Sequence, residues 1–192
     1  MQLKNYLSQE FGLSKEILED ISNAGTRRVF SKGEIIVKPG NLSKNVFFIE
    51  EGLVKMFYYK EDRSITHYFF SENNLITRSE NFYETSLHLK KSDYGLMALE
   101  YQTAIFQFPF SKIKKWSETS VQMNKVIQHI LLDILKGFSN RLNSIQFENA
   151  KERYAQLLAD NPEIILRAPL GDIASYLGIS QQTLSVMRSR LK

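Results

Sequence analysis

Cysteine is absent from this chain of 192 residues. Its absence excludes disulfide bonds, thiol redox sensing and iron–sulfur clusters held by cysteine. Long apolar runs are absent as well, since no uninterrupted run approaches the roughly 20 residues of a membrane-spanning helix. Charged residues interrupt the segment 1–21 throughout, so it lacks the apolar core of a signal peptide. We therefore expect a cytoplasmic, bacterial protein.

Excess charge of either sign is small, with a formal net charge of +4 at pH 7. Such a balance is compatible with nucleic-acid binding but does not require it, because many basic proteins bind none. Hydrophobic residues make up 43% of the chain, which is typical of a globular protein. The length fits one large domain or two modest ones.

Glycine and proline are few, at nine and four residues, and several of them separate short segments of alternating polarity. After two short helices expected within 3–21, with Ser14 as a cap between them, corners occur at Gly33, Gly40 and Gly52. Short strands at even spacing with such corners predict a sandwich or barrel. The expected strands are 27–30, 34–38, 45–50, 53–59, 64–70, 94–100 and 103–108.

A long helix is predicted from about residue 117 to residue 145. Apolar residues recur there at heptad spacing, and the helix is longer than one small domain needs, so we predict a dimerisation helix with Asn124 setting its register. Val126, Ile130 and Leu135 are expected to widen the stripe until it also contacts the barrel. A stripe that contacts only the chain's own core is the alternative. The predicted dimer residues are Ile127, Leu131, Ile134, Phe138, Leu142 and Ile145.

The segment 170–192, LGDIASYLGISQQTLSVMRSRLK, contains two short amphipathic stretches that meet at Gly178. This pattern predicts a helix-turn-helix. Gly178 can adopt the left-handed conformation that ends the first helix, and Ser180 can cap the second. Leu184 and Met187 would then face inward.

Polar residues cover the other face of the second helix, and between 180 and 192 three residues are basic and none is acidic. Amide and hydroxyl side chains can bond base edges, and basic side chains can neutralise phosphates. We therefore predict a DNA-reading face; a solvated face on a helical cap is the alternative. The predicted DNA-binding residues are Ser180, Gln181, Gln182, Thr183, Ser185, Val186, Arg188 and Arg190.

The order of these parts resembles the cyclic-AMP receptor and fumarate–nitrate regulator (Crp/Fnr) superfamily of bacterial transcription factors. The resemblance covers nearly the whole chain and is carried by FSKGEIIVKPGNLSKNVFFIEEGLVKMFYY near one end and IASYLGISQQTLSVMRSRL at the other. It implies an α+β fold with an N-terminal double-stranded β-helix (jelly-roll) barrel of the cyclic-nucleotide-binding type, a long dimerisation helix and a C-terminal helix-turn-helix domain. The corresponding divisions are 1–116, 117–146 and 147–192. The resemblance also implies a homodimer that binds double-stranded DNA and RNA polymerase.

A polar segment at 71–93 interrupts the strand series, and long loops inside a domain are often functional. The resemblance implies a phosphate-binding cassette here, in which an arginine holds the cyclic phosphate and a glutamate the ribose. Glu72 matches, but the closing position reads Lys91-Ser92-Asp93. Lysine lacks bidentate geometry and Asp93 opposes an anion, so we expect no usual response to cyclic AMP and no cofactor. The candidate effector-pocket residues are Glu72, Asn73, Arg78, Lys91 and Ser92; a surface pair of Glu72 and Lys91 on a loop is the alternative.

The recognition helix also departs from the family's pattern, because Val186 stands where cyclic-AMP-type members carry a base-reading arginine. Valine can contact a thymine methyl, and Gln181 and Gln182 suit adenine edges. We therefore expect an operator different from the family's best-known one, read without a wing strand after the helix.

Two other function classes stay open. A cupin-type enzyme would need clustered metal ligands, but the three histidines, His67, His88 and His129, are 21 and 41 residues apart. Gly-rich phosphate loops and nucleophile motifs are absent too, so we predict neither an enzyme nor a metal site. The second alternative is a ligand-binding module that regulates through a protein partner.

Overall fold

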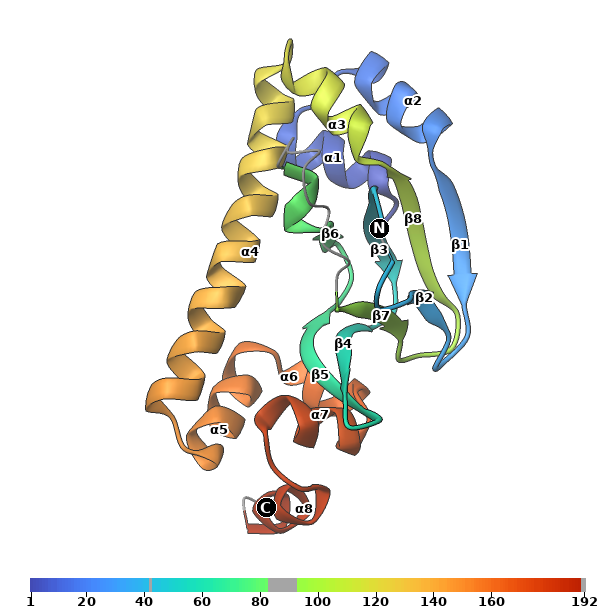
Figure 1. Cartoon of the computed structure of the whole chain (residues 1–192). Helices are drawn as coiled ribbons and strands as arrows, with labels where there is room; N and C mark the ends of the chain where they lie inside the picture. Colours follow the sequence, from blue (N-terminus) through green and yellow to red (C-terminus); the bar gives the residue numbers. More distant parts are fainter. Residues whose placement is uncertain (42, 83–92, 191–192) are drawn as a thin grey trace.

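Two short helices at the N-terminus precede a barrel of short strands in the computed structural model, which describes residues 1–41, 43–82 and 93–190 (Figure 1). Helix α1 spans Leu3–Phe11 and helix α2 spans Lys15–Ala24. The Ser14 hydroxyl accepts a hydrogen bond from the backbone N–H of Ile17 at 3.4 Å, so Ser14 caps α2 as predicted.

Within the described residues, eight strands form two four-stranded sheets with antiparallel pairing, in the orders β1-β8-β3-β6 and β2-β7-β4-β5. Most consecutive strands lie in opposite sheets, as in a jelly roll. This arrangement confirms the predicted barrel and each of its expected strands, whereas β6 was missed because it contains only two residues. The strands are β1 Thr26–Phe30, β2 Ile35–Val37, β3 Asn45–Glu51, β4 Val54–Lys60, β5 Arg63–Phe70, β6 Leu75–Ile76, β7 Gly95–Ala98 and β8 Thr103–Pro109.

Apolar side chains from both sheets form the barrel's own core. Branched and aromatic residues that alternate along the strands face the interior, where they exclude water and hold the sheets together. The buried members are Phe30, Phe47, Ile49, Val54, Ile76, Leu96, Ala98 and Ile105. Gly52, between β3 and β4, has a φ of +101°, and a Cβ there would lie 2.7 Å from the Thr103 hydroxyl, so the corner requires glycine.

A second core joins the N-terminal helices to helices α3 (Phe110–Ser117) and α4 (Val121–Phe147). Helix α4 begins a few residues after the predicted start near residue 117, because the Ser120 hydroxyl accepts from the N–H of Met123 at 3.2 Å and caps the helix there. The amide of Asn124 donates to the carbonyls of Ser117 and Ser120. The role of Asn124 in setting the register of a dimer stays a prediction.

The C-terminal region contains four helices near the ends of β4 and β5 (Figure 1): α5 (Ala150–Asp160), α6 (Pro162–Arg167), α7 (Leu170–Leu177) and α8 (Gln181–Arg190). Asn149 and Glu152 form a capping box that starts α5. Helix α6 was not expected, because a segment of six residues that begins with a proline carries too little periodicity to identify.

Candidate nucleic-acid interface

Helices α7 and α8 are joined by the tight turn that the sequence predicts. Gly178 is left-handed with φ 69°, and the N–H of Ile179 returns to the carbonyl of Ala174 at 3.0 Å. The Ser180 hydroxyl accepts from the N–H of Thr183 at 3.1 Å, so Ser180 caps α8 as expected. Leu184 is fully buried against α7, which fixes the rotation of α8 about its own axis.

The N-terminal half of α8 presents a polar face to solvent. Here the structure agrees with the predicted exposure, including that of Val186, which is 49% exposed. A Cβ at Gly171 would lie 2.6 Å from the amide nitrogen of Gln181, so this amide lies against the start of α7. The exposed residues at this face are Ser180, Gln181, Gln182, Thr183, Ser185 and Val186.

Arg188 occupies a different position from the one predicted. Its Nη2 donates to the carbonyl of Ile165 at 3.1 Å, and its side chain is only partly exposed. The guanidinium therefore bonds one of the last carbonyls of α6, where a cation is electrostatically favoured, and does not extend into solvent toward a phosphate. Arg190 ends α8, but its side chain lies outside the described part of the chain.

Two further arginines hold the carboxyl end of α7. Arg141, from α4, donates to the carbonyl of Tyr176 at 2.8 Å. Its guanidinium carbon lies over the Tyr176 ring, 4.8 Å from the ring centroid. Arg153, from α5, donates to the carbonyl of Leu177 from Nε and Nη2 at 3.0 and 2.9 Å. Both guanidinium groups satisfy carbonyls that have no partner within the helix.

The other side of α7 packs against the barrel strand β5. Lys55, which is 4% exposed, donates to Asp172 at 2.5 Å and to the hydroxyl of Ser64 at 3.2 Å. The Thr66 hydroxyl donates to the same carboxylate, and the Thr66 N–H donates to the hydroxyl of Ser175 at 3.0 Å. Barrel residues also share an apolar cluster with the C-terminal helices, through Leu53, Phe69 and Leu99.

Arg167, the last residue of α6, binds two carboxylates of the barrel. Its Nη1 and Nη2 donate to Glu72 at 2.9 and 2.7 Å, and its Nε and Nη2 donate to Glu100 at 2.9 and 2.7 Å. Glu72 also accepts from the N–H of Gly52 at 2.8 Å. Burial raises the pKa of the Glu72 carboxyl, but the hydrogen bonds from Arg167 and from two backbone N–H groups outweigh this effect and lower the pKa to about 2.

Glu72 and Arg78 of the predicted effector pocket have partners within the chain, and the role of the pocket residues in binding an effector stays a prediction. The carboxylate of Glu72 is bound to Arg167, whereas Nη1 of Arg78 donates to the carbonyl of Asn41 at 3.3 Å, so the two side chains have different partners. Asn73 is left-handed, and its side-chain oxygen is buried without a hydrogen-bond partner. Lys91 and Ser92 lie outside the described residues, as does the alternative pair of Glu72 and Lys91.

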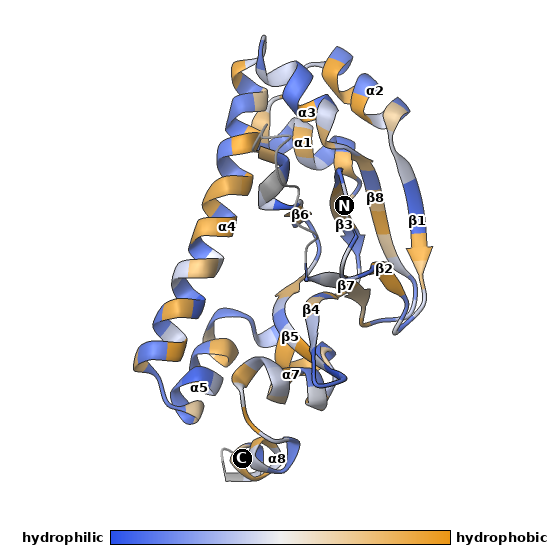
Figure 2. Cartoon of the chain, viewed as in Figure 1, coloured by the Kyte–Doolittle hydropathy of each residue, from blue (hydrophilic) through white to orange (hydrophobic). Residues whose placement is uncertain are grey.

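Helix α4 exposes an unpaired apolar face along much of its length, and Figure 2 shows apolar residues recurring along the helix. Ile127 and Ile134 of the predicted seam are partly buried against the chain's own core, whereas Val126 and Ile130 are fully buried in it. Leu135 is 64% exposed, so the expectation that it contacts the barrel is wrong. The large apolar residues exposed along the face are Leu131, Leu132, Leu135, Phe138, Leu142 and Ile145.

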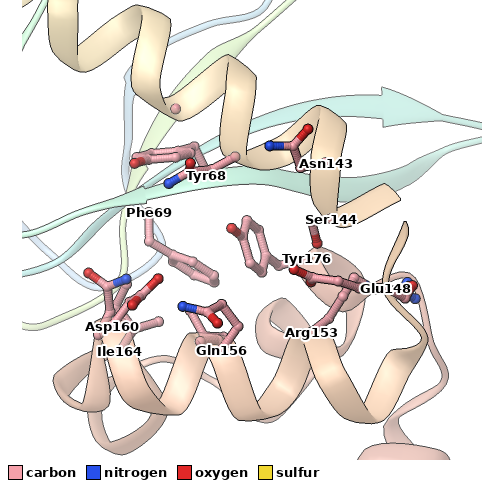
Figure 3. A pocket seen from close by; sticks show the side chains of 14 residues that line it. Tyr68, Phe69, Asn143, Ser144, Glu148, Arg153, Gln156, Asp160, Ile164 and Tyr176 are labelled. Atoms are coloured by element: carbon pink, nitrogen blue, oxygen red, sulfur yellow. The ribbon is translucent and has the colours of Figure 1, made fainter. Parts of the chain in front are cut away.

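A polar cavity of about 230 Å³ lies where α4, β5, α5 and α7 meet (Figure 3). The rings of Phe69 and Tyr176 stand in its centre with centroids 5.4 Å apart, and Gln156 and Asn143 face it from α5 and α4.

The histidines do not form a common site in the described structure. The ring of His67 lies near that of Tyr94 on the barrel, with centroids 4.7 Å apart and the rings tilted by 45°; His129 bonds the hydroxyl of Tyr6 at 3.2 Å, and His88 lies outside the described residues. Among the residues described, no group of three or more metal-ligating side chains is placed to hold a metal ion. No helix among the described residues is both long enough and apolar enough to cross a bilayer.

No family model matches the chain. Among curated proteins, Electron transport regulator A of Shewanella oneidensis is 23% identical over 179 residues, covering 86% of this chain and 68% of the relative. The Fumarate and nitrate reduction regulatory protein of Yersinia pestis is 23% identical over 196 residues, covering 95% of this chain and 75% of the relative.

Solved structures of other proteins share the fold of this chain. FixK2 from Bradyrhizobium japonicum has a TM-score of 0.73 at 19% identity, covering 87% of this chain and 84% of its own. A transcriptional regulator assigned to the crp/fnr family, from Eubacterium rectale, has a TM-score of 0.71 at 18% identity, covering 95% and 85%. The chain is thus similar in sequence to curated transcription regulators and shares the fold of solved Crp/Fnr-type structures.

Proposed function

We propose that this protein is a sequence-specific DNA-binding transcription regulator that acts as a homodimer. The observation that carries the proposal is the exposed polar face at the start of α8, which is capped by Ser180 and contains no acidic residue. A helix with such a face can enter the major groove and exchange hydrogen bonds with base edges. RNA polymerase is a further partner that the family resemblance suggests.

The reading chemistry follows from the residues at this face. Gln182 can bond adenine bidentately, Ser185 can bond several bases, and Val186 can contact a thymine methyl. Because Arg188 is bound to the carbonyl of Ile165, base and phosphate contacts fall to the other residues of the face. The operator is expected to be rich in A·T pairs at the positions that the glutamines read.

The exposed apolar face of α4 supports the homodimer. Six large apolar side chains along one helix form the kind of continuous patch that monomers rarely leave in water. Pairing α4 with its copy would bury the patch and place two copies of α8 on one side of the DNA. The proposed division into an effector region 1–116, a dimerisation helix 117–146 and a DNA-binding region 147–192 follows this arrangement.

We also propose that cyclic AMP is not the usual effector. The glutamate expected to meet a ribose is bound to Arg167, and the barrel interior is filled by apolar side chains such as Phe47. Both features favour a different effector or a protein partner at the barrel. A ligand-binding module that regulates through a protein partner is the second candidate function.

Selection of bound sequences from a random DNA pool tests the proposal, followed by affinity measurements over a range of salt concentrations. A regulator should enrich a near-palindrome with half-sites about one helical turn apart and lose affinity steeply as salt rises. A protein that enriches no sequence, and shows no retention on DNA at low salt, would instead be the partner-binding module.

A further inference from the structure

The connection between the barrel and the DNA-reading helix is polar, specific and continuous. We infer that Arg167 is a positioning residue for DNA binding: by bonding Glu72 and Glu100 it fixes the orientation of α8 relative to the barrel. This inference rests on the proposed function, but the contact itself can be measured without DNA. The name Arg167 clamp is used below for Arg167, Glu72 and Glu100.

The first step of the argument is the geometry of the Arg167 clamp. The three nitrogens of one guanidinium donate to four carboxylate oxygens at 2.7 to 2.9 Å. Glu72 follows β5, Glu100 lies between β7 and β8, and Gly52, which bonds Glu72, lies between β3 and β4. A planar fork of this kind holds its partners in one relative orientation, which a lysine could not do. Arg167 therefore ties α6 to three separate turns at one end of the barrel.

The second step is the route from Arg167 to the reading helix. Arg167 ends α6, and the carbonyl of Ile165 in the same short helix accepts the hydrogen bond from Arg188 of α8. A rotation of α6 that breaks the Arg167 clamp would therefore move the acceptor of Arg188. Helix α8 also packs on α7 through Leu184, so α6, α7 and α8 form one packed unit.

The third step is the independent contact of this unit with β4 and β5. Lys55 is buried at 4% exposure, and Asp172 of α7 neutralises it. When two charges are buried, a displaced arrangement leaves each without its partner, so the pair mainly penalises incorrect docking. Apolar contacts of Leu53, Phe69 and Leu99 with the C-terminal helices add stability. The barrel thus contacts the DNA-reading unit directly, in addition to the connection through α4.

The consequence concerns how an effector at the barrel would act. Any binding event that moves the turns at Gly52, Glu72 or Glu100 would shift Arg167 and, through α6, the reading helix. In a dimer, opening either Arg167 clamp would then loosen the separation of the two α8 helices. Specific DNA binding should therefore depend most strongly on the Arg167 clamp when both half-sites of the operator must be bound at one fixed spacing.

The experiment uses the full-length protein and two variants of the clamp, Arg167→Ala and Arg167→Lys, with Leu166→Ala as the matched control. Leu166 is the neighbouring residue in α6 and is 86% exposed, so its truncation leaves the contacts intact. Hydrogen exchange at the Thr66 N–H, which donates to Ser175 across the contact, measures docking without DNA. Binding to the selected operator and to versions with altered half-site spacing measures positioning.

Arg167→Ala should speed exchange at Thr66, weaken binding at the preferred spacing by about tenfold and flatten the dependence on spacing. Arg167→Lys should fall between this variant and the wild type, and Leu166→Ala should match the wild type. Unchanged exchange together with an unchanged spacing profile would overturn the inference.

If Arg167→Ala does not fold, the variant Glu100→Gln, which keeps the side-chain shape, is tested by the same two measurements. If the wild type binds no DNA, the proposed function fails, and the exchange arm still decides whether Arg167 fastens the unit.

Discussion

Nη2 of Arg188 donates to the main-chain carbonyl of Ile165 at 3.1 Å, which joins α8 to the carboxyl end of α6. A basic residue near the end of a recognition helix is expected to contact phosphate, but here it performs an internal bonding role. This difference separates residues that hold the DNA-reading unit together from residues that can meet DNA, and the predictions below use it.

Arg188→Ala should lower the free energy of unfolding by about 1 to 3 kcal/mol, because the carbonyl of Ile165 loses a charged donor in a partly buried position. Urea denaturation measures the change. Ser189→Ala, at the next position, changes an exposed hydroxyl and should have little effect. Unchanged stability combined with a selective loss of DNA affinity would mean that Arg188 contacts DNA after all.

Replacing Gln182 and Ser185 together with alanine should remove specific DNA retention while the stability changes by less than about 1 kcal/mol, since both side chains are exposed. The loss arises because base edges lose their hydrogen-bonding partners. Gel-shift titration against the selected operator, with denaturation as the control, gives the answer. Specific binding that survives in this variant would place the reading face elsewhere.

Leu131→Glu or Phe138→Glu should convert the protein to a monomer, because a carboxylate at a buried dimer seam is left unpaired. Sedimentation velocity measures the change in mass. Lys136→Glu introduces the same carboxylate on α4 outside the exposed apolar face, so it should leave the assembly unchanged. A dimer that persists in both seam variants would show that another surface joins the subunits.

The contribution of Glu72 to stability should depend on pH. Its folded pKa is lowered from 4.5 to about 2, so its ionised form stabilises the fold above the unfolded pKa. The stability difference between the wild type and Glu72→Gln should therefore be constant above about pH 6 and shrink as pH falls from about 4.5 toward 2. Urea unfolding of both proteins across this range measures the difference. A difference that grows as the solution becomes more acidic would contradict the ion pair.

Local features could be predicted from the sequence because their causes lie within a few residues. Ser14 and Ser180 cap helices through hydroxyls that bond an N–H three residues later, and Gly178 ends α7 because it tolerates a left-handed conformation. Period-two alternation identified the strands, apart from the two-residue β6. Apolar residues at helical spacing identified α4, although they did not identify the break at 118–120 that precedes it.

The candidate site was predicted only in part, for reasons that concern distance along the chain. The exposure of Gln182 and Ser185 follows from helical periodicity, but whether Arg188 meets solvent depends on a carbonyl 23 residues earlier. Likewise, the apolar face of α4 was evident, but only packing decided that Ile134 is partly buried while Leu135 is exposed.

The order of barrel, long helix and C-terminal helices is encoded locally along the chain, by periodicity, caps and turns. Only the tertiary structure decided that Arg167 binds Glu72 and that Lys55 binds Asp172, pairs separated by 95 and 117 residues. Charge and residue type allow many such pairs along the chain. The pairs that form are those that the docking of α6 and α7 on the barrel brings within hydrogen-bond distance and shields from water.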